Sequence, residues 1–180
     1  MGVNLIPFPD LREDATSMSD EVKRRKSEAE IDTNTLRNQK ESNLWDIKQL
    51  KEKIEKEKQE TFPREDDIKE WQEEIDEDNA KIEDINEKLA RGLEALERLS
   101  EARGKLREYF DKAKSQLSDL ESNPERALGS DSSDEDNEKF EEYIRVIVGE
   151  IEDEEEGHKN AEDELQKSLE TTREILTKTE

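Results

Sequence analysis

Carboxylates are the most abundant reactive groups in this chain, and a single histidine, His158, lies among them. Pairs of carboxylates recur at helical spacing, for example Glu73 with Asp76 and Glu152 with Glu156. Acid–base catalysis requires two carboxyl groups whose pKa values are pushed apart in a sheltered cleft. No cysteine, no glycine-rich phosphate loop and no nucleophile motif accompanies these residues. We therefore predict a protein that is not an enzyme and holds no cofactor or metal.

The densest polar stretch is the run LGSDSSDEDNEKF, from Leu128 to Phe140. Counted from Asp131 it resembles an EF-hand calcium loop, but Asp136 stands where that loop needs glycine for its sharp turn. Ser132 and Ser133 each precede an acidic residue by three positions, a pattern typical of acid-directed serine kinase substrates. We interpret the run as a solvated hinge first and a phosphorylation site second.

The composition excludes a large globular core. Charged residues make up 46% of the 180 residues and hydrophobic residues only 28%, whereas a compact domain is close to half apolar. Disorder or long helices that bury narrow stripes remain as alternatives, and periodicity favours helices. The formal net charge is −23, so the chain should repel nucleic acid and attract basic surfaces.

Location is expected to be intracellular, in the cytoplasm or the nucleus. No apolar run approaches the roughly 18 residues that span a bilayer, and the first residues lack the pattern of a secretion signal. The basic cluster KRRK, from Lys23 to Lys26, resembles a short nuclear-import signal, but an exposed charged helix face is the favoured explanation.

A heptad pattern starting at Ile68 continues through eight repeats and predicts a helix over residues 66–121. Pro63 precedes this helix and Pro124 follows it, where proline is tolerated. Asp78 and Arg103 are charged residues in the otherwise apolar seam. They either set the register of the helices, as polar seam residues can, or open to water.

Two further helices are predicted, over residues 19–60 and 136–180. The short connection TFPR makes the first two antiparallel neighbours. The expected fold is all-α: an elongated antiparallel three-helix bundle, or a helical-hairpin coiled coil if the acidic third helix packs on another chain. Residues 1–18 form an N-terminal arm, residues 19–121 the hairpin, and residues 122–135 an acidic linker.

Several apolar residues lie off the predicted seams and are candidates for partner contact. Trp45 lies on the opposite side of its helix from Ile47, and exposed tryptophan is typical of interface hot spots. The N-terminal arm and the third helix supply the others. The predicted partner-binding residues are Leu5, Ile6, Phe8, Trp45, Val146 and Val148.

Two functions from different classes follow from these features. The first is a coiled-coil scaffold or adaptor, a subunit of a larger complex that binds protein through helix–helix contacts, with a second copy among the candidate partners. The alternative is an acidic binding module that engages a basic protein surface, as a histone chaperone or a DNA mimic does. Neither function involves a membrane or direct contact with nucleic acid.

Overall fold

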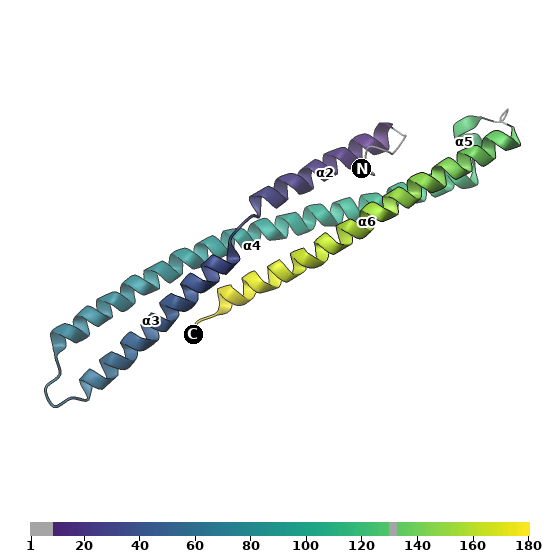
Figure 1. Ribbon diagram of the computed structural model, residues 1–180. Coiled ribbons are helices and arrows are strands. Elements are labelled where there is room, and N and C mark those ends of the chain that lie inside the picture. Colours follow the sequence, from purple (N-terminus) through teal and green to yellow (C-terminus); the bar gives the residue numbers. More distant parts are fainter. Residues whose placement is uncertain (1–8, 130–132) are drawn as a thin grey trace. The chain divides into compact units, whose positions relative to one another are not determined.

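The computed structural model describes residues 9–129 and 133–180, and all its regular elements are helices (Figure 1). In chain order they are α2 (Pro9–Glu28), α3 (Thr33–Lys58), α4 (Glu65–Ser122), α5 (Glu125–Leu128) and α6 (Asp134–Thr177). The chain divides into unit 1, formed by Met1–Glu28 and Leu96–Lys167, and unit 2, formed by Ala29–Ala95 and Ser168–Glu180. Three long helical segments meet in each unit, which confirms the predicted all-α helical bundle.

The two longest helices begin and end close to their predicted limits. α4 starts with three consecutive acidic residues, which interact favourably with the positive end of the helix dipole. At the start of α6, Ser133 Oγ accepts a hydrogen bond from the Asp136 backbone N–H at 3.2 Å. The Asp136 carboxylate in turn accepts one from the Ser133 N–H at 3.4 Å. This reciprocal pair is a capping box, which makes Ser133 the N-cap of α6.

The predicted first helix, residues 19–60, is wrong in its start and in its continuity. Helix α2 already begins at Pro9, inside the predicted arm, and the helix breaks between Glu28 and Thr33. Asp32 caps the second piece, since its Oδ1 accepts the Thr35 N–H at 3.0 Å. At the break Ile31 lies against Gly92 of α4, where a Cβ atom would come within 2.2 Å of the Ile31 Cδ1.

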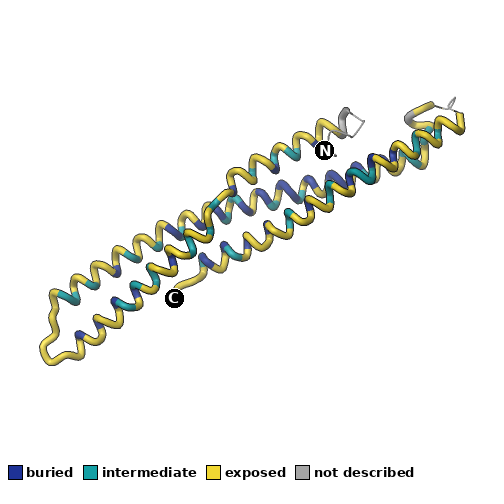
Figure 2. The backbone as a smooth tube through the Cα atoms, in the orientation of Figure 1, coloured by how far each residue is buried: buried dark blue, intermediate teal, exposed yellow. Residues whose placement is uncertain are grey.

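In unit 1, α2 and the N-terminal part of α6 pack on the C-terminal part of α4, and α6 runs antiparallel to α4. Arg107 pairs with Glu162 at 3.0 Å and Lys114 with Glu155 at 2.8 Å, so the numbering falls on one helix as it rises on the other. Buried positions follow one side of each helix (Figure 2). The buried hydrophobic residues of α4 and α6 in this unit include Leu106, Phe110, Ala113, Leu117, Ile144, Ile147 and Ile151.

In unit 2, α3 and the N-terminal part of α4 form an antiparallel hairpin that also contacts the end of α6. Glu57 joins the two arms at the turn, because its carboxylate accepts hydrogen bonds from both the backbone and the guanidinium of Arg64. The Lys53 ammonium lies 5.9 Å from the ring centroid of Trp71. The aliphatic core of the hairpin contains Ile47, Leu50, Ile54 and Ile75, with Ile68, Trp71 and Ile82 packed around it.

Lys40 attaches the end of α6 to α3 within unit 2. Its side chain is 1% exposed, and its ammonium donates hydrogen bonds to the Ile175 carbonyl at 2.6 Å and to the Leu176 carbonyl at 3.1 Å. The last carbonyls of a helix have no partner within the helix, and a cation there also complements the helix dipole. A buried lysine therefore caps the C-terminus of α6.

Candidate functional site

The α3 surface, which we define as Trp45, Lys48 and Lys51, is the largest exposed aromatic feature of unit 2 outside the turn. Trp45 keeps 62% of its surface exposed. It lines a hollow of about 590 Å³ whose other walls come from α3 and from the residues at and after the end of α6. The lining residues are Glu41, Leu44, Trp45, Ile47, Lys48, Lys51, Glu52, Lys178, Thr179 and Glu180.

The position of Trp45 follows from what the other side of α3 buries. Ile47, Leu50 and Ile54 face α4, so a residue two positions before Ile47 lies on the far side of the helix. Lys178 closes one edge of the hollow through its ion pair with Glu41 at 2.8 Å. That hydrogen bond lowers the pKa of the Glu41 carboxyl group. Packing therefore holds Trp45 outward on a fixed helix.

Helix α3 as a whole carries a small excess of positive charge, opposite in sign to the net charge of the protein. Residues 33–58 contain seven basic and five acidic side chains. Within the part of the chain that the structure describes, neither Lys48 nor Lys51 forms an ion pair. The α3 surface is thus an exposed indole beside two lysines that form no ion pair in the described structure, and Glu41 and Glu52 line the same hollow.

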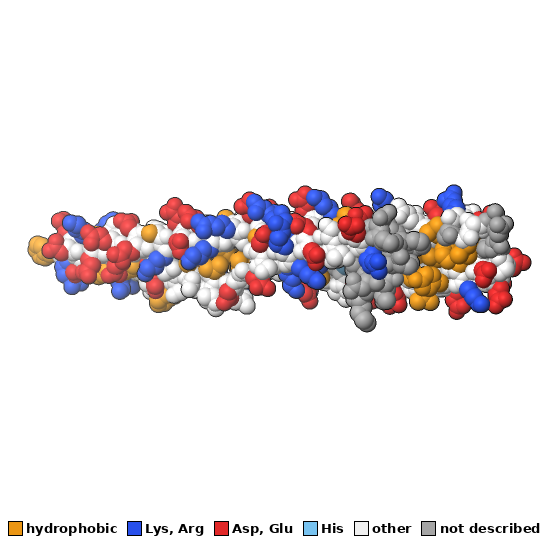
Figure 3. All heavy atoms as spheres, turned by 90° about the horizontal axis from the view of Figure 1, so that it is seen from above, with side chains coloured by type: hydrophobic (Ala, Val, Ile, Leu, Met, Phe, Trp, Pro, Cys, Tyr) orange, Lys and Arg blue, Asp and Glu red, His pale blue; other side chains and the backbone are white. Residues whose placement is uncertain are grey.

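The α6 surface, which we define as Glu142, Tyr143, Val146 and Glu150, is the corresponding feature of unit 1. Tyr143 is 50% exposed and Val146 55% exposed. They lie three residues apart and hence on one face of the helix, while Ile144, Ile147 and Ile151 face α4. Figure 3 shows hydrophobic side chains gathered toward the right of the view, at the end of unit 1 that holds the end of α4, α5 and the start of α6.

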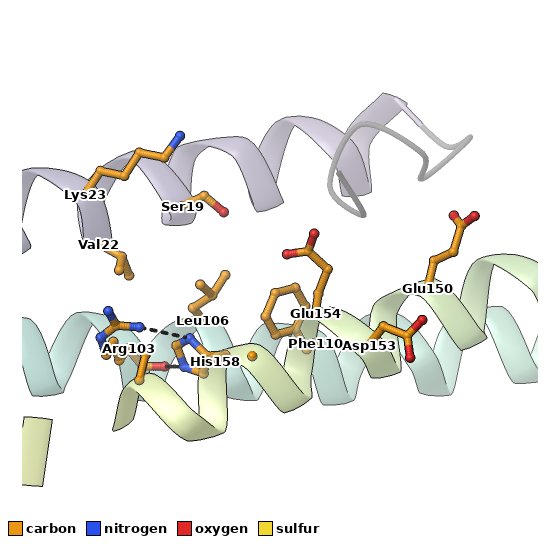
Figure 4. A pocket seen from close by; sticks show the side chains of 12 residues that line it. Ser19, Val22, Lys23, Arg103, Leu106, Phe110, Glu150, Asp153, Glu154 and His158 are labelled. Atoms are coloured by element: carbon orange, nitrogen blue, oxygen red, sulfur yellow. Dashed lines mark hydrogen bonds between the residues drawn. The ribbon is translucent and has the colours of Figure 1, made fainter. Parts of the chain in front are cut away.

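A cavity of about 610 Å³ lies between α2, α4 and α6 of unit 1 (Figure 4). Leu106 and Phe110 of α4 and Val22 of α2 line it with apolar side chains, and Glu150, Asp153 and Glu154 line it from α6. A Cβ atom at Gly157 would have no neighbour within 4 Å, so this part of the α6 wall is open.

His158 lies in the wall of this cavity, and both of its ring nitrogens are engaged. Nε2 lies 2.8 Å from the Arg103 carbonyl oxygen and 3.1 Å from Glu162 Oε1, and both oxygens are acceptors, so this nitrogen carries the hydrogen and donates it. Nδ1 then accepts from Arg103 Nη1 at 3.5 Å. The ring also packs edge-on against Phe110, with centroids 6.1 Å apart. In this arrangement both ring nitrogens of His158 have partners, and the ring links α6 to α4.

Arg103 is 9% exposed, and its Nε is buried without a hydrogen-bond partner in the described structure. Burial lowers the pKa of its guanidinium, while the charges of Glu162 and Glu164 raise it. The second charged residue of the predicted seam, Asp78, has a side chain that is 13% exposed and lies 3.8 Å from Lys81. Arg103 is therefore enclosed rather than open to water; a role of either residue in setting register stays a prediction.

The other predicted site residues fall into three groups. Leu5, Ile6, Phe8 and Ser132 lie outside the described residues. Val146 is exposed as expected, whereas Val148 is half-buried. Ser133 is exposed, and its hydroxyl accepts the cap hydrogen bond of α6.

Sequence reasoning missed two exposed aromatic residues. Tyr143 lies one helical turn before Val146, and the same off-seam criterion that selected Val146 finds it. Phe62, which is 89% exposed, is in the turn between α3 and α4, where no helical periodicity applies.

Across the described ranges, no cluster of three or more histidine or carboxylate side chains is arranged to hold a metal ion. None of the described helices is both long and apolar enough to cross a bilayer. No family model, no curated protein and no solved structure matches this chain.

Proposed function

We propose that this chain is a non-enzymatic helical scaffold that binds other proteins through the α3 and α6 surfaces. The single observation that carries the proposal is Trp45, an indole that is 62% exposed on a helix whose opposite face is packed. Tryptophan is enriched among the residues that contribute most to binding energy in protein interfaces. An exposed indole on a fixed helix supplies such an anchor without a large rearrangement on binding.

The division of each helix into a buried face and a charged face supports the same function. Helix–helix recognition uses an apolar ridge at helical spacing with charged residues beside it. Tyr143 and Val146 form a short ridge of this kind on α6, and Trp45 forms one on α3. The aliphatic seams fix both helices, and the remaining apolar residues are then presented to a partner.

Affinity purification from the cells that make the protein tests this proposal, with partners identified by mass spectrometry. Trp45→Ala and Val146→Asp are compared with Phe62→Ala, which removes an exposed aromatic side chain outside both surfaces. We expect at least one partner to be retained by wild type and Phe62→Ala and lost from one of the surface variants. Identical partner sets for all four proteins would contradict the proposal.

The acidic binding module is the second candidate, and the charge of α6 favours it. Residues 134–156 contain twelve acidic and two basic side chains. Binding through such a surface weakens steeply with salt, because it rests on screened charges. If the purified partners dissociate between about 0.05 and 0.3 M salt regardless of Trp45→Ala, the acidic module is favoured over the scaffold.

A further inference from the structure

We propose that the α3 surface of one copy of this chain binds the α6 surface of a second copy. This inference rests on the proposed function, because it names a partner for the same two surfaces. The two surfaces have the complementary properties that an interface requires, in apolar shape and in charge.

The apolar parts match in kind. Trp45 offers a flat indole that is 62% exposed, and Tyr143 and Val146 offer a ridge that is 50% and 55% exposed. Gly149 follows Val146 by three residues, on the same face of α6, and a Cβ atom there would meet nothing within 4 Å. The missing side chain lets an aromatic ring approach the α6 backbone beside Val146.

The charged parts match in sign. Lys48 and Lys51 flank the indole, and Glu142 and Glu150 lie four residues before and after Val146. The helical segments around the two surfaces also differ in the sign of their charge. Residues 33–58 contain seven basic and five acidic side chains, whereas residues 134–156 contain two basic and twelve acidic ones. Complementary local charge selects partner and orientation even where the net charges of two molecules repel.

A contact between two different surfaces is heterologous, so each copy can bind one neighbour through α3 and another through α6. Wild-type protein should therefore assemble beyond the dimer with rising concentration. An isologous dimer, in which the same surface meets itself, would stop at two copies.

Sedimentation velocity of the full chain tests the contact. The salt concentration is about 0.15 M, where charges more than about 8 Å apart are largely screened. Wild type, Trp45→Ala, Val146→Asp and Phe62→Ala are compared up to about 0.1 mM, where contacts of micromolar affinity are populated. Both surface residues are more than half exposed, so these variants should keep their helical circular dichroism.

We expect wild type and Phe62→Ala to associate, and each surface variant alone to lose at least about tenfold in affinity. An equimolar mixture of the two surface variants should form a dimer and stop there. In that mixture the intact Trp45 of one variant meets the intact Val146 of the other, and the remaining pair of surfaces is broken. A mixture that stays monomeric, or a Trp45→Ala protein that still associates, would overturn the proposal.

Charge reversal provides a second route that leaves every apolar residue in place. Lys48→Glu with Lys51→Glu should prevent self-association, and so should Glu142→Lys with Glu150→Lys in a separate chain. Mixing the two chains restores opposite charges at the contact and should restore assembly. If wild type stays monomeric while affinity purification still yields Trp45-dependent partners, this inference fails and the proposed function stands.

Discussion

Lys40 in unit 2 and Arg103 in unit 1 are both buried cations, and they differ in how fully their hydrogen-bond donors are used. The ammonium of Lys40 meets two carbonyls at the end of α6. Arg103 reaches His158 only at 3.5 Å and leaves its Nε unpartnered in the described structure. Burial lowers the pKa of both groups, so both cations carry a desolvation penalty. They differ in the hydrogen bonds that offset this penalty.

From this comparison we expect a buried cation to stabilise the fold only where it donates hydrogen bonds to buried acceptors that lack another strong donor. Lys40 supplies the donor for the Leu176 carbonyl and gives the Ile175 carbonyl a second, shorter hydrogen bond beside the one from the Lys178 backbone N–H at 3.3 Å. Arg103 satisfies one ring nitrogen. We therefore expect the lysine to be required for the packing of its unit and the arginine to be replaceable.

The largest losses in the free energy of unfolding should come from substitutions in the apolar cores, and the losses at Lys40 and Arg103 are compared with these. Leu117 in unit 1 and Leu89 in unit 2 are both 0% exposed. Replacement of either by alanine should lower the free energy of unfolding by about 3 kcal/mol through lost burial and a cavity. Urea unfolding followed by circular dichroism measures the loss. A cost below about 1 kcal/mol in one unit would mean that this unit is loosely packed.

Lys40→Met should cost about 2 kcal/mol, because the methionine side chain fills the space but leaves the Leu176 carbonyl without its donor and the Ile175 carbonyl with only the Lys178 backbone N–H at 3.3 Å. Hydrogen exchange should show the loss first in the last turn of α6. Lys48→Met is the matched control, since that lysine is exposed and should change stability by less than about 0.5 kcal/mol. Equal effects of the two substitutions would remove the structural role assigned to Lys40.

A glycine in each unit sharpens the comparison of packing. Gly104 in unit 1 has no atom within 4 Å of a built Cβ, so Gly104→Ala should stabilise the protein by about 0.5–1 kcal/mol. Gly92→Ala in unit 2 should lose that gain, because the added methyl group meets Ile31. When Ile31 is also replaced by alanine, Gly92→Ala should again increase stability. Thermal unfolding of wild type, Gly92→Ala, Ile31→Ala and the double variant tests whether the close approach of Ile31 explains the glycine at position 92.

The turn of unit 2 should respond to pH through Glu57. Hydrogen bonds from the side chain and then the backbone of Arg64 lower the pKa of this carboxyl group. The ionised form is therefore favoured in the folded state. Its contribution to stability is complete above the ordinary glutamate pKa and is lost as the pH falls through the lowered value.

The melting temperature of wild type should accordingly exceed that of Glu57→Gln at neutral pH, and the difference should shrink as the solution is acidified. Glu55→Gln, at a side chain that is 69% exposed, is the matched control for removal of one carboxylate from the same helix. A constant difference for Glu57→Gln would show that its pairing with Arg64 does not stabilise the turn.

Arg103→Met should have the smallest effect, within about 1 kcal/mol of wild type in either direction. Replacing an incompletely paired buried ion by an apolar side chain of similar volume is often neutral or stabilising. The same methionine substitution at Lys40 should be clearly destabilising, so the two variants test the comparison directly. A loss of about 3 kcal/mol or more at Arg103 would show that its charge is well compensated.

The sequence by itself determined the all-α class and the two longest helices, but not the start or the continuity of the first predicted helix. The heptads that start at Ile68 predict α4 to within one residue at each end, because a sustained period of seven is compatible with only one backbone conformation. The same periodicity identified Trp45 and Val146 as residues outside the seams. Local patterns of this kind are sufficient wherever one face of a single helix is in question.

Only the tertiary structure decided which glycine permits close approach and how the buried charges are satisfied. At the break in the first helix, Ile31 contacts Gly92, which lies sixty-one positions along the chain. The environment of Lys40 depends on carbonyls 135 and 136 residues away. Helical periodicity carries no information on such distant contacts, because it specifies which face is buried and not which atoms it meets.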